Sequence, residues 1–587
     1  MLKPGYYTKG LLMKELHRID DTIPEKNGNF MKEKLKIGIL LNNFSIPLWQ
    51  YSIINDIKNS DFVDIVLVIK NNPEHSKSRQ RKSDTSRSLA RLLEKADKII
   101  FKGKHEYNLK KEVSELFTDV PQLDLNSTNT LLPVSSGNIP DEIRNFNTDI
   151  IVKFGFHILD EGILKVPKYG IWAYTIDDYE ISNQIDAGFW EVLRKKPVTN
   201  SSLVILNGNL SENTVLFSSW ESTSPFSINI TRNKIYWRSS LFIPRIINGL
   251  HRNSDNYLGN LINRFKSVKP DKELQLLALS SFTLLLNILN YFSVAARTVF
   301  HKLFYTDDFN WSLLYNISNE NNKLDLTDLG SFKKITPPKG YFWADPFVVA
   351  ENQNYYIFVE EFIYKKNRAH LSVLKLDAEG KLLSFEKIIE RPYHMSYPSV
   401  FKIGPTYYMI PETSQNKTIE LYRCTDFPNK WVFDRNIMEN LSAVDSTTFY
   451  FNDKWWLFTS IDQTDDRVGA STELFLFYTD DILSGDWKSH PMNPIVSDER
   501  TARPAGKLFV REGKIYRTSQ DCSVRYGRGF NLNEVTKLTD TEYEESLLSR
   551  AEPSWDEKLK GSHTYNFDKE FTVLDIYSFR KRIRINS

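Results

Sequence analysis

Five short segments in the second half of this 587-residue chain each place a polar or aromatic residue at the same point of a strand-like pattern. Their central residues are Asp345, Tyr397, Asp445, Arg503 and His563, which are 52, 48, 58 and 60 residues apart. A carboxylate exchanges protons, a guanidinium binds oxyanions, and an imidazole titrates near neutral pH. These groups are the ones that acid–base chemistry on a hydroxyl-bearing or anionic substrate requires.

A further carboxylate and several aromatic rings accompany the five centres. Glu412 follows in the segment IPET, and Tyr341 and Trp343 precede Asp345. Flat aromatic faces suit sugar rings, and one acid with one base suits a glycosidic bond. Polar residues at strand starts also cap turns, which is the alternative for each residue taken alone. We predict a sugar-processing site with catalytic Asp345, Glu412 and Asp445 and with substrate-binding Tyr341, Trp343, Tyr397, Arg503 and His563.

The repeat itself indicates the elements that position these residues. Each central segment is followed about ten residues later by an aromatic or β-branched run, as FWADPFVV is by YYIFVEE and AVDSTTFYF is by WWLFTSI. A period of about 50 residues with several strands per unit predicts propeller blades. We therefore predict an all-β five-bladed β-propeller over residues 326–587. Its innermost strands would bring the five centres together at one end of a central channel.

The propeller motifs carry a resemblance to known families. The run from WADPFVV through ERPYHMSYPSVF, MIPETS, AVDSTTF, ARPAGKLF and GSHTYN, over about residues 326–575, resembles the N-terminal domain of plant glucosamine inositolphosphorylceramide transferases. More broadly, the WADPF strand and the blade number resemble the glycoside hydrolase superfamily of five-bladed propellers, which includes β-xylosidases, arabinofuranosidases and fructosidases. The resemblance implies the propeller fold and a glycan-related role.

The hydrolase resemblance also implies residue roles. The first-blade Asp of that superfamily is a general base or nucleophile, which corresponds to Asp345, and a third-blade Asp that orients the sugar corresponds to Asp445. The general acid is a Glu. Glu412 is our candidate, although it lies in the second blade, and Glu360 or Glu361 is the alternative.

The first half of the chain has a different pattern. LKIGILL and VDIVLVIKNN are continuous apolar runs on either side of a helical stretch at 48–59, and KIIFKG, DIIVKFGF and YGIWAYT follow as further strand candidates. Buried strands that alternate with helices predict an α/β domain with a mostly parallel sheet. We place this domain at residues 34–255, after a tail at 1–33 and before a helical linker at 256–325.

The stretch from Asp149 to about Leu250 resembles the catalytic domain of folate-dependent formyltransferases, which implies a Rossmann-type fold over about residues 36–250. That family's catalytic Asn and His fall on Ala173 and Thr175, and its Asp falls on Ser211–Asn213. Because alanine supplies no donor and threonine no imidazole, we predict a degenerate domain. An N-formyltransferase for an amino sugar, using a tetrahydrofolate derivative and the propeller for recognition, remains an alternative. A non-enzymatic glycan-binding scaffold is another.

Composition and motifs limit the kinds of partner and cofactor that we expect for this protein. Lys and Arg number 76 against 74 Asp and Glu, so no overall field favours nucleic acid. The cysteines, Cys424 and Cys522, form no disulfide framework and fit a reducing cytoplasm. The sequence contains no phosphate or metal motif, and we predict no metal or cofactor for the leading function. The expected partner is a sugar, nucleotide-sugar or glycolipid substrate.

One uncharged stretch must be assessed as a possible membrane-contacting segment. Residues 274–296 contain no charged side chain, but seven polar residues interrupt them. A membrane span needs about 20 predominantly apolar residues. We therefore predict a buried or interfacial helix in a cytoplasmic protein, with peripheral membrane contact through residues 274–296 as the alternative.

Overall fold

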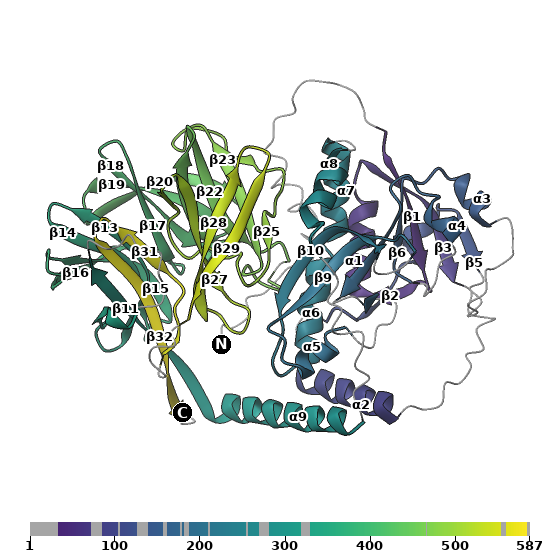
Figure 1. Ribbon diagram of the computed structural model, residues 1–587, viewed down its shortest axis with the longest axis horizontal. Helices are drawn as coiled ribbons and strands as arrows, with labels where there is room; N and C mark the ends of the chain where they lie inside the picture. Colours follow the sequence, from purple (N-terminus) through teal and green to yellow (C-terminus); the bar gives the residue numbers. More distant parts are fainter. Residues whose placement is uncertain are drawn as a thin grey trace. The chain divides into compact units, whose positions relative to one another are not determined.

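Two compact units divide the chain between Phe300 and His301. The computed structural model describes residues 33–71, 85–103, 106–125, 139–155, 161–176, 179–180, 187–208, 212–253, 256–268, 281–318, 329–464, 466–552 and 559–583. Figure 1 shows an α/β unit with a central sheet and a unit built of strands alone. We describe each unit by itself.

A mostly parallel sheet forms the centre of the first unit, with the strand order β10-β9-β7-β6-β1-β3-β5 and with β8 paired to β7. β1 pairs in parallel with both β3 and β6, and β9 and β10 are antiparallel at one edge. The apolar run of β1 is buried on both faces, since Ile37, Ile39 and Leu40 are fully inaccessible. The strands are β1 (Leu35–Leu41), β3 (Val63–Asn71), β5 (Gln122–Leu125), β6 (Ile150–Lys153), β7 (Ile171–Ile176), β8 (Tyr179–Glu180), β9 (Val198–Ile205) and β10 (Thr214–Ser222), and β2 (Ser45–Pro47) pairs with β4 (Lys110–Glu112) outside this sheet.

The helices of this unit confirm the helical stretch predicted at 48–59 and correct the strand predicted for KIIFKG. They are α1 (Leu48–Lys58), α2 (Thr85–Ile100), α3 (Ile139–Arg144), α4 (Glu161–Leu164), α5 (Phe189–Leu193), α6 (Ile228–Ser239), α7 (Phe242–Asn253), α8 (Asn256–Phe265) and α9 (Ser281–Phe304). The segment KIIFKG, which we predicted as a strand, begins inside α2. Leu93, Asp97 and Phe101 are buried at a spacing of four residues, so the helical period continues through this segment.

Residues 256–325, which we predicted as a helical linker, divide between the two units. Phe265 of α8 packs against Phe217 of β10 with ring centroids 5.4 Å apart, and Tyr291 of α9 donates a hydrogen bond to Asp97 of α2. β11 (Tyr305–Ile317) instead joins a propeller blade. Part of the uncharged stretch 274–296 lies in α9, and none of the described helices is long and apolar enough to cross a bilayer.

The second unit is a five-bladed β-propeller, as the repeat predicts. Blade 1 contains β13 (Tyr341–Glu351), β14 (Asn354–Ile363), β15 (Arg368–Leu376) and β16 (Leu382–Ile389). Blade 2 contains β17 (Ser396–Ile403), β18 (Thr406–Thr413), β19 (Thr418–Asp426) and β20 (Lys430–Glu439). Blade 3 contains β21 (Ala443–Phe451), β22 (Lys454–Ile461), β23 (Glu473–Thr479), β24 (Lys488–Ser489) and β25 (Val496–Ser497). Blade 4 contains β26 (Phe509–Arg511), β27 (Lys514–Asp521), β28 (Gly529–Leu538) and β29 (Tyr543–Ala551).

Blade 5 is assembled from both ends of the propeller sequence. β30 (Leu559–Gly561) and β31 (Tyr565–Asp568) pair with β32 (Phe571–Ile583), and β32 pairs with β11, which is followed by β12 (Lys333–Ile335). The pairing of β11 with β32 runs from Tyr305 opposite Ile583 to Ile317 opposite Phe571. This blade therefore closes the ring, because its strands come from the beginning and the end of the unit.

Apolar clusters fill the space between each pair of neighbouring blades. They include Phe347 with Val400 between blades 1 and 2, Ile410 with Phe475 between 2 and 3, Phe458 with Ile515 between 3 and 4, Phe530 with Leu574 between 4 and 5, and Val348 with Val573 between 5 and 1. Burial of these side chains is the main force that holds the blades together. Many aromatic residues of the propeller lie in these clusters.

Candidate functional site

One backbone device recurs in the innermost strands of blades 1, 2 and 3. Asp345, Tyr397 and Asp445 have φ angles of 51°, 46° and 53°, and the strand register shifts at each of them. A β-bulge of this kind redirects a side chain, and a left-handed non-glycine residue is strained unless its surroundings hold it. Three of the five predicted centres thus occupy equivalent positions through the same local distortion.

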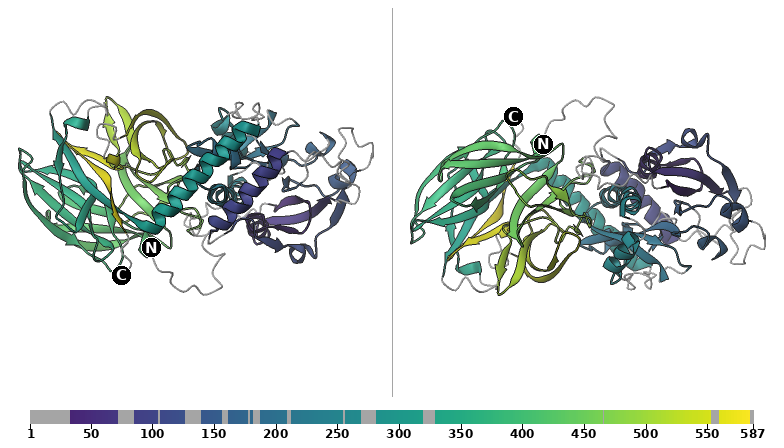
Figure 2. Two further views of the ribbon diagram at one scale, coloured as in Figure 1. Left: turned by 90° about the horizontal axis from the view of Figure 1, so that it is seen from below. Right: turned by 90° about the horizontal axis from the view of Figure 1, so that it is seen from above.

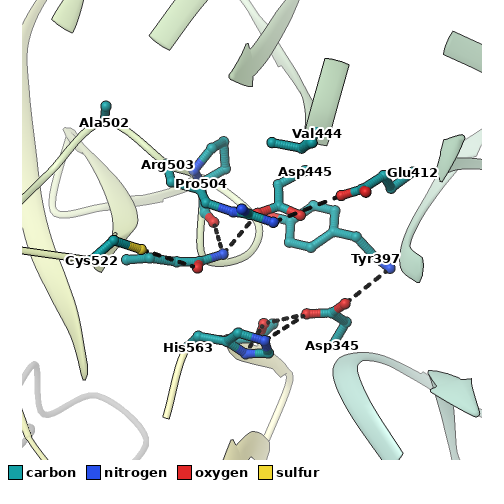
Figure 3. A network of polar contacts seen from close by, with 12 residues as sticks. Asp345, Tyr397, Glu412, Val444, Asp445, Ala502, Arg503, Pro504, Cys522 and His563 are labelled. Atoms are coloured by element: carbon teal, nitrogen blue, oxygen red, sulfur yellow. Dashed lines mark hydrogen bonds and ion pairs between the residues drawn. The ribbon is translucent and has the colours of Figure 1, made fainter. Parts of the chain in front are cut away.

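Arg503 and His563, the other two centres, are placed in the same region without such a bulge. Arg503 precedes Pro504, which bridges to Ser519, and the carbonyl of Arg503 accepts a hydrogen bond from the Gln520 amide at 2.8 Å. His563 lies in the gap between β30 and β31. Figure 3 shows that all five centres and Glu412 lie in one network of polar contacts, as the sequence predicts.

Asp345 is the acceptor at the junction of blades 1, 2 and 5. Its Oδ1 accepts from the Thr564 hydroxyl at 3.0 Å, and its Oδ2 accepts from the Tyr397 amide at 3.2 Å. The His563 Nε2 lies 3.6 Å from Oδ1. Burial raises the pKa of Asp345 well above its usual value, and the neighbouring His563 acts in the opposite direction. The carboxyl group is therefore held in a fixed position and has a strong affinity for a proton.

His563 is oriented by a second buried carboxylate. Its Nδ1 lies 2.6 Å from Asp575 Oδ2, and its own amide donates to Asp575 Oδ1 at 2.8 Å. Burial lowers the pKa of His563, but Asp575 and Asp345 outweigh this effect and raise the pKa to about 9. At neutral pH His563 is consequently an imidazolium, flanked by the carboxyl groups of Asp575 and Asp345.

Asp345, His563 and Asp575 lie close enough together to be considered as a metal site. Asp345, His563 and Asp575 each offer a ligand atom within 4.8 Å of one another. Asp575 already accepts from the amides of Asp345, His563 and Thr564 and from the His563 ring. Its lone pairs are therefore used by the protein, and the arrangement fits a hydrogen-bonded charge network better than a cation site.

Asp445 and Arg503 form a buried ion pair on the other side of the network. Arg503 Nε donates to Asp445 Oδ2 at 2.5 Å, and Gln520 Nε2 donates to the same oxygen at 2.7 Å. Burial disfavours the charge on Arg503, but Asp445 outweighs it and raises the pKa of Arg503 above its ordinary value. Oδ1 of Asp445 accepts no hydrogen bond from the described residues, which leaves this oxygen for a ligand.

Glu412, at the end of β18, completes the group of carboxylates. Its Oε2 lies 3.8 Å from Arg503 Nη2, and its Oε1 accepts from the Ser414 hydroxyl at 2.8 Å. Burial and the nearby Asp445 raise the pKa of Glu412 to about 7, against the opposing effects of Arg503 and His394. The side chain is 12% exposed, so solvent or a ligand reaches it. Glu412 thus has the protonation behaviour of a general acid at neutral pH.

His394 was missed by the sequence reasoning because it lies in a loop outside the repeat centres. Its Nε2 is 3.3 Å from Glu360 Oε1. Burial lowers the pKa of His394, but Glu360, Glu412 and Asp345 outweigh burial and raise it to about 9. His394 therefore contributes a positive charge near Glu412.

The alternative acids have separate environments. Glu361 accepts from the Trp343 indole at 2.7 Å and lies 2.9 Å from His370, and these partners lower its pKa although burial would raise it. An ionised carboxylate in such a network has a structural role. Glu360 contacts His394 and stays close to the site.

The predicted sugar-stacking rings require a correction. Trp343 is 1% exposed and packs in the cluster between blades 5 and 1, and Tyr397 is inaccessible and hydrogen-bonds Thr447 at 2.8 Å. Neither ring has a face that a sugar could cover, since both serve the blade core. Tyr341 is half-buried at the start of β13, where its amide donates to the Pro338 carbonyl at 3.2 Å, and it is not among the residues that the described polar contacts join to the network.

Tyr526, in the loop between β27 and β28, has the exposed ring that these residues lack. It is 43% exposed, the Arg503 guanidinium lies 5.0 Å from its ring centroid, and the His563 ring contacts it edge-on at 5.3 Å. The loop passes close to β30, because a Cβ on Gly561 would lie 1.8 Å from the carbonyl oxygen of Gly527. The repeat gave no signal for Tyr526, since it lies between strands.

The cysteine nearest the site is not a nucleophile. Cys522 Sγ contacts Gln520 Oε1 at 3.8 Å, and burial raises the pKa of Cys522 to about 12. The thiol therefore stays protonated at neutral pH, and a thiol is a poor nucleophile without deprotonation.

The positions compared with formyltransferases lie partly in the described α/β unit. Ala173 is buried in β7, and Thr175 follows in the same strand. Asn213 accepts a hydrogen bond from the Asn207 amide at 3.1 Å within a turn, and Ser211 lies outside the described residues. The side chains described at these positions are involved in strand and turn structure.

The second unit is thus a five-bladed β-propeller in which all five blades contribute a polar or charged group to one network. Residues 330–582 match the family described as "Glucosamine inositolphosphorylceramide transferase 1, N-terminal". A rice relative, the Glucosamine inositolphosphorylceramide transferase 1 of Oryza sativa subsp. japonica, is 33% identical over 238 residues, which are 39% of this chain and 31% of the relative. The protein of the same name from Arabidopsis thaliana is 29% identical over 230 residues, 38% of this chain and 29% of the relative. The matched part thus spans about a third of these relatives.

The solved structures that match parts of this chain show low overall similarity to it. Zg3597, a family 117 glycoside hydrolase of the marine bacterium Zobellia galactanivorans, has a TM-score of 0.31 at 10% identity over 46% of this chain and 90% of its own. The α-L-arabinofuranosidase PaAbf62A of Podospora anserina has a TM-score of 0.31 at 12% identity over 41% and 92%. Glycinamide ribonucleotide transformylase 1 of Symbiobacterium toebii has a TM-score of 0.25 at 10% identity over 39% and 92%. At these scores no conclusion about this chain rests on them.

Proposed function

We propose that the propeller is a carbohydrate-active enzyme that transfers or hydrolyses a glycosyl group at the network of Figure 3. The observation that carries the proposal is the convergence of three carboxylates from three blades, one of which has a pKa of about 7. Glycosidic bond cleavage needs a carboxylic acid and a carboxylate in one site. Glu412, with its pKa of about 7, is present in both forms near neutral pH, and Asp345 and Asp445 supply the other two carboxyl groups of the site.

Glu412 is the proposed general acid. A group whose pKa lies near the working pH is present in both protonation states and transfers its proton readily. Glu412 has this pKa of about 7 and is partly exposed, whereas Asp345 and Asp445 are almost fully buried. In the reaction Glu412 gives its proton to the glycosidic oxygen as the bond from that oxygen to the anomeric carbon breaks.

Asp345 is the proposed base. It takes the proton from the attacking oxygen, which belongs to water in hydrolysis or to an acceptor hydroxyl in transfer, while that oxygen bonds to the anomeric carbon. Burial gives Asp345 a strong affinity for the proton it takes, and the charge on His563, 3.6 Å away, opposes this effect and favours the ionised form that the role requires. Asp345 then releases its proton to solvent, and Glu412 takes up a proton from solvent.

Asp445 and Arg503 position the substrate and tune Glu412 in this proposal. Arg503 contacts both carboxylates, at 2.5 Å to Asp445 and 3.8 Å to Glu412. Asp445 raises the pKa of Glu412, and Arg503 lowers it. The free Oδ1 of Asp445 is suited to accept a hydrogen bond from a sugar hydroxyl.

The proposed substrate is a sugar on an anionic donor or a glycolipid. Arg503, His394 and His563 supply positive charge at the site, which suits phosphate oxygens. The names of the rice and Arabidopsis relatives specify a transferase, glucosamine and inositolphosphorylceramide. We extend the glycan and phosphate chemistry of those names to this chain as part of the proposal. The exposed ring of Tyr526 is the proposed stacking face for the sugar.

The test uses the full chain with p-nitrophenyl glycosides, and with UDP-sugars in the presence of a soluble inositol phosphate acceptor. Once a turned-over sugar is identified, Asp345→Asn and Glu412→Gln are each expected to lower the rate by about 100-fold or more, since both lose a proton-transfer group. Asp568→Asn is the matched control, because Asp568 accepts from the Ala350 amide at the other end of β13.

Two results would contradict the proposal. One is turnover in Asp345→Asn within twofold of the native rate. The other is sugar binding by the native chain without turnover of any donor, which would indicate a glycan-binding scaffold. Thermal unfolding of each variant separates lost chemistry from lost folding.

A further inference from the structure

α2 and α9 lie side by side on one face of the α/β unit. The Tyr291 hydroxyl of α9 donates to Asp97 of α2, and Ile288 of α9 packs in one cluster with Leu93 of α2. Figures 1 and 2 both show these helices as neighbours at the edge of the unit, and seen from below they lie in front of its sheet. Their inner faces are therefore fixed by the unit, and their outer faces are turned outward.

The outer face of α9 has a stripe of exposed apolar side chains, beside the exposed polar residues Asn290 and Ser293. Leu289, Phe292 and Phe300 are 57%, 40% and 55% exposed, and Ala296 between them is exposed as well. These positions are spaced by three and four residues, which places them in one stripe along the helix. α9 thus has one apolar face that packs inward and another that faces solvent.

The outer face of α2 also has exposed apolar side chains. Leu92, Ile99 and Ile100 are 63%, 81% and 50% exposed. Ile99 is the most exposed of the large apolar side chains among the described residues. Exposed apolar groups that gather on neighbouring elements mark an interaction surface for a protein, a membrane or a ligand.

Positive charge surrounds these apolar side chains. Among the described side chains of the two helices and of the residues just beyond α2, the exposed cations are Arg91, Lys95, Lys98, Lys102 and Arg297. Of the acidic residues of α2 between Arg91 and Ile100, Glu94 is 19% exposed and paired with Arg232 at 2.7 Å, and Asp97 is buried. The whole chain is nearly neutral, so this surface is a local concentration of positive charge.

We propose that the outer faces of α2 and α9 bind the surface of an anionic lipid bilayer. Apolar side chains of an interfacial helix enter the boundary between headgroups and acyl chains, and lysines and arginines beside them contact anionic headgroups. A symmetric pairing of two copies would place these cations against one another. Nucleic acid would neutralise the cations and leave Leu289 and Ile99 in water. The bilayer is the partner that satisfies both kinds of side chain.

The test is sedimentation of the full chain with vesicles of phosphatidylcholine containing about one third phosphatidylserine. The protein is expected to bind these vesicles, to bind pure phosphatidylcholine more weakly, and to dissociate at ~1 M salt. The double variant Lys95→Gln with Lys98→Gln is expected to weaken binding about 25-fold, at about fivefold for each cation. Ile99→Ser with Phe292→Ser is expected to weaken binding to both kinds of vesicle.

Matched controls come from the propeller. Lys333→Gln with Lys334→Gln removes two exposed lysines, and Leu548→Ser removes an exposed apolar side chain, and these changes are expected to leave vesicle binding unchanged. No binding to anionic vesicles, or binding that ignores the α2 and α9 variants, overturns the proposal. So does a stable dimer that Ile99→Ser with Phe292→Ser dissociates. Glu412→Gln should bind vesicles normally, so failure of the catalytic proposal is distinguishable from failure of this one.

Discussion

At the scale of single residues, the candidate site depends on buried charges that modify each other. Glu412 has a pKa near 7 because burial and Asp445 outweigh the nearby cations, while His563 keeps its charge because two carboxylates flank it. Residue types and repeat phase were enough to predict that Asp345, Asp445, Arg503 and His563 come together. They were not enough to separate a core ring from a binding ring, because exposure depends on which blade packs against it.

The exposed aromatic ring of the site provides a prediction at this scale. Replacing Tyr526 by Ala removes a stacking face and should raise the KM for a sugar substrate about five- to tenfold, with a smaller effect on kcat. Tyr526→Phe keeps the ring and should remain within about twofold of the native KM. Steady-state kinetics on both variants measure this split. A loss of kcat at unchanged KM in Tyr526→Ala would contradict the stacking role.

At the scale of elements, the site is produced by irregularities in otherwise regular strands. The bulges at Asp345, Tyr397 and Asp445 recur in blades 1, 2 and 3, and the repeat of about 50 residues made the blades predictable. The bulges themselves were not predictable, since a left-handed residue leaves little trace when it is not glycine. The KIIF segment was mispredicted for a related reason, because a short apolar run fits both a strand and the end of a helix.

A glycine under the Tyr526 loop provides a prediction for this scale. A Cβ on Gly561 would lie 1.8 Å from the backbone oxygen of Gly527, so Gly561→Ala must displace the loop. We expect Gly561→Ala to raise KM as Tyr526→Ala does and to lower thermal stability. Gly259→Ala in α8 is the control, because a Cβ there meets no atom within 4 Å. A Gly561→Ala variant with native KM and native melting temperature would show that the loop does not need this close approach.

At the scale of the whole molecule, two differently built units occur in one chain. The sequence predicted an α/β unit and five blades, and both are confirmed as architectures. It did not predict that β11, which begins at Tyr305, completes the blade containing β32, because the partners lie at opposite ends of the propeller and only one of them falls in the repeat. It also predicted a linker where α8 and α9 pack onto the first unit through Phe265 and Tyr291.

The central claim is that Glu412 donates a proton from a pKa of about 7, and the pH dependence of kcat/KM tests it most directly. Since the folded protein raises this pKa from 4.5, Glu412 is protonated below about pH 7 and loses the proton above it. We predict that kcat/KM falls tenfold per pH unit above about 7 in the native chain, and that Glu412→Gln has a low, flat rate across this range because it lacks the titrating group. His394 and His563, with pKa values of about 9, keep their charge through this limb. An alkaline limb near pH 7 that persists in Glu412→Gln would contradict the assignment.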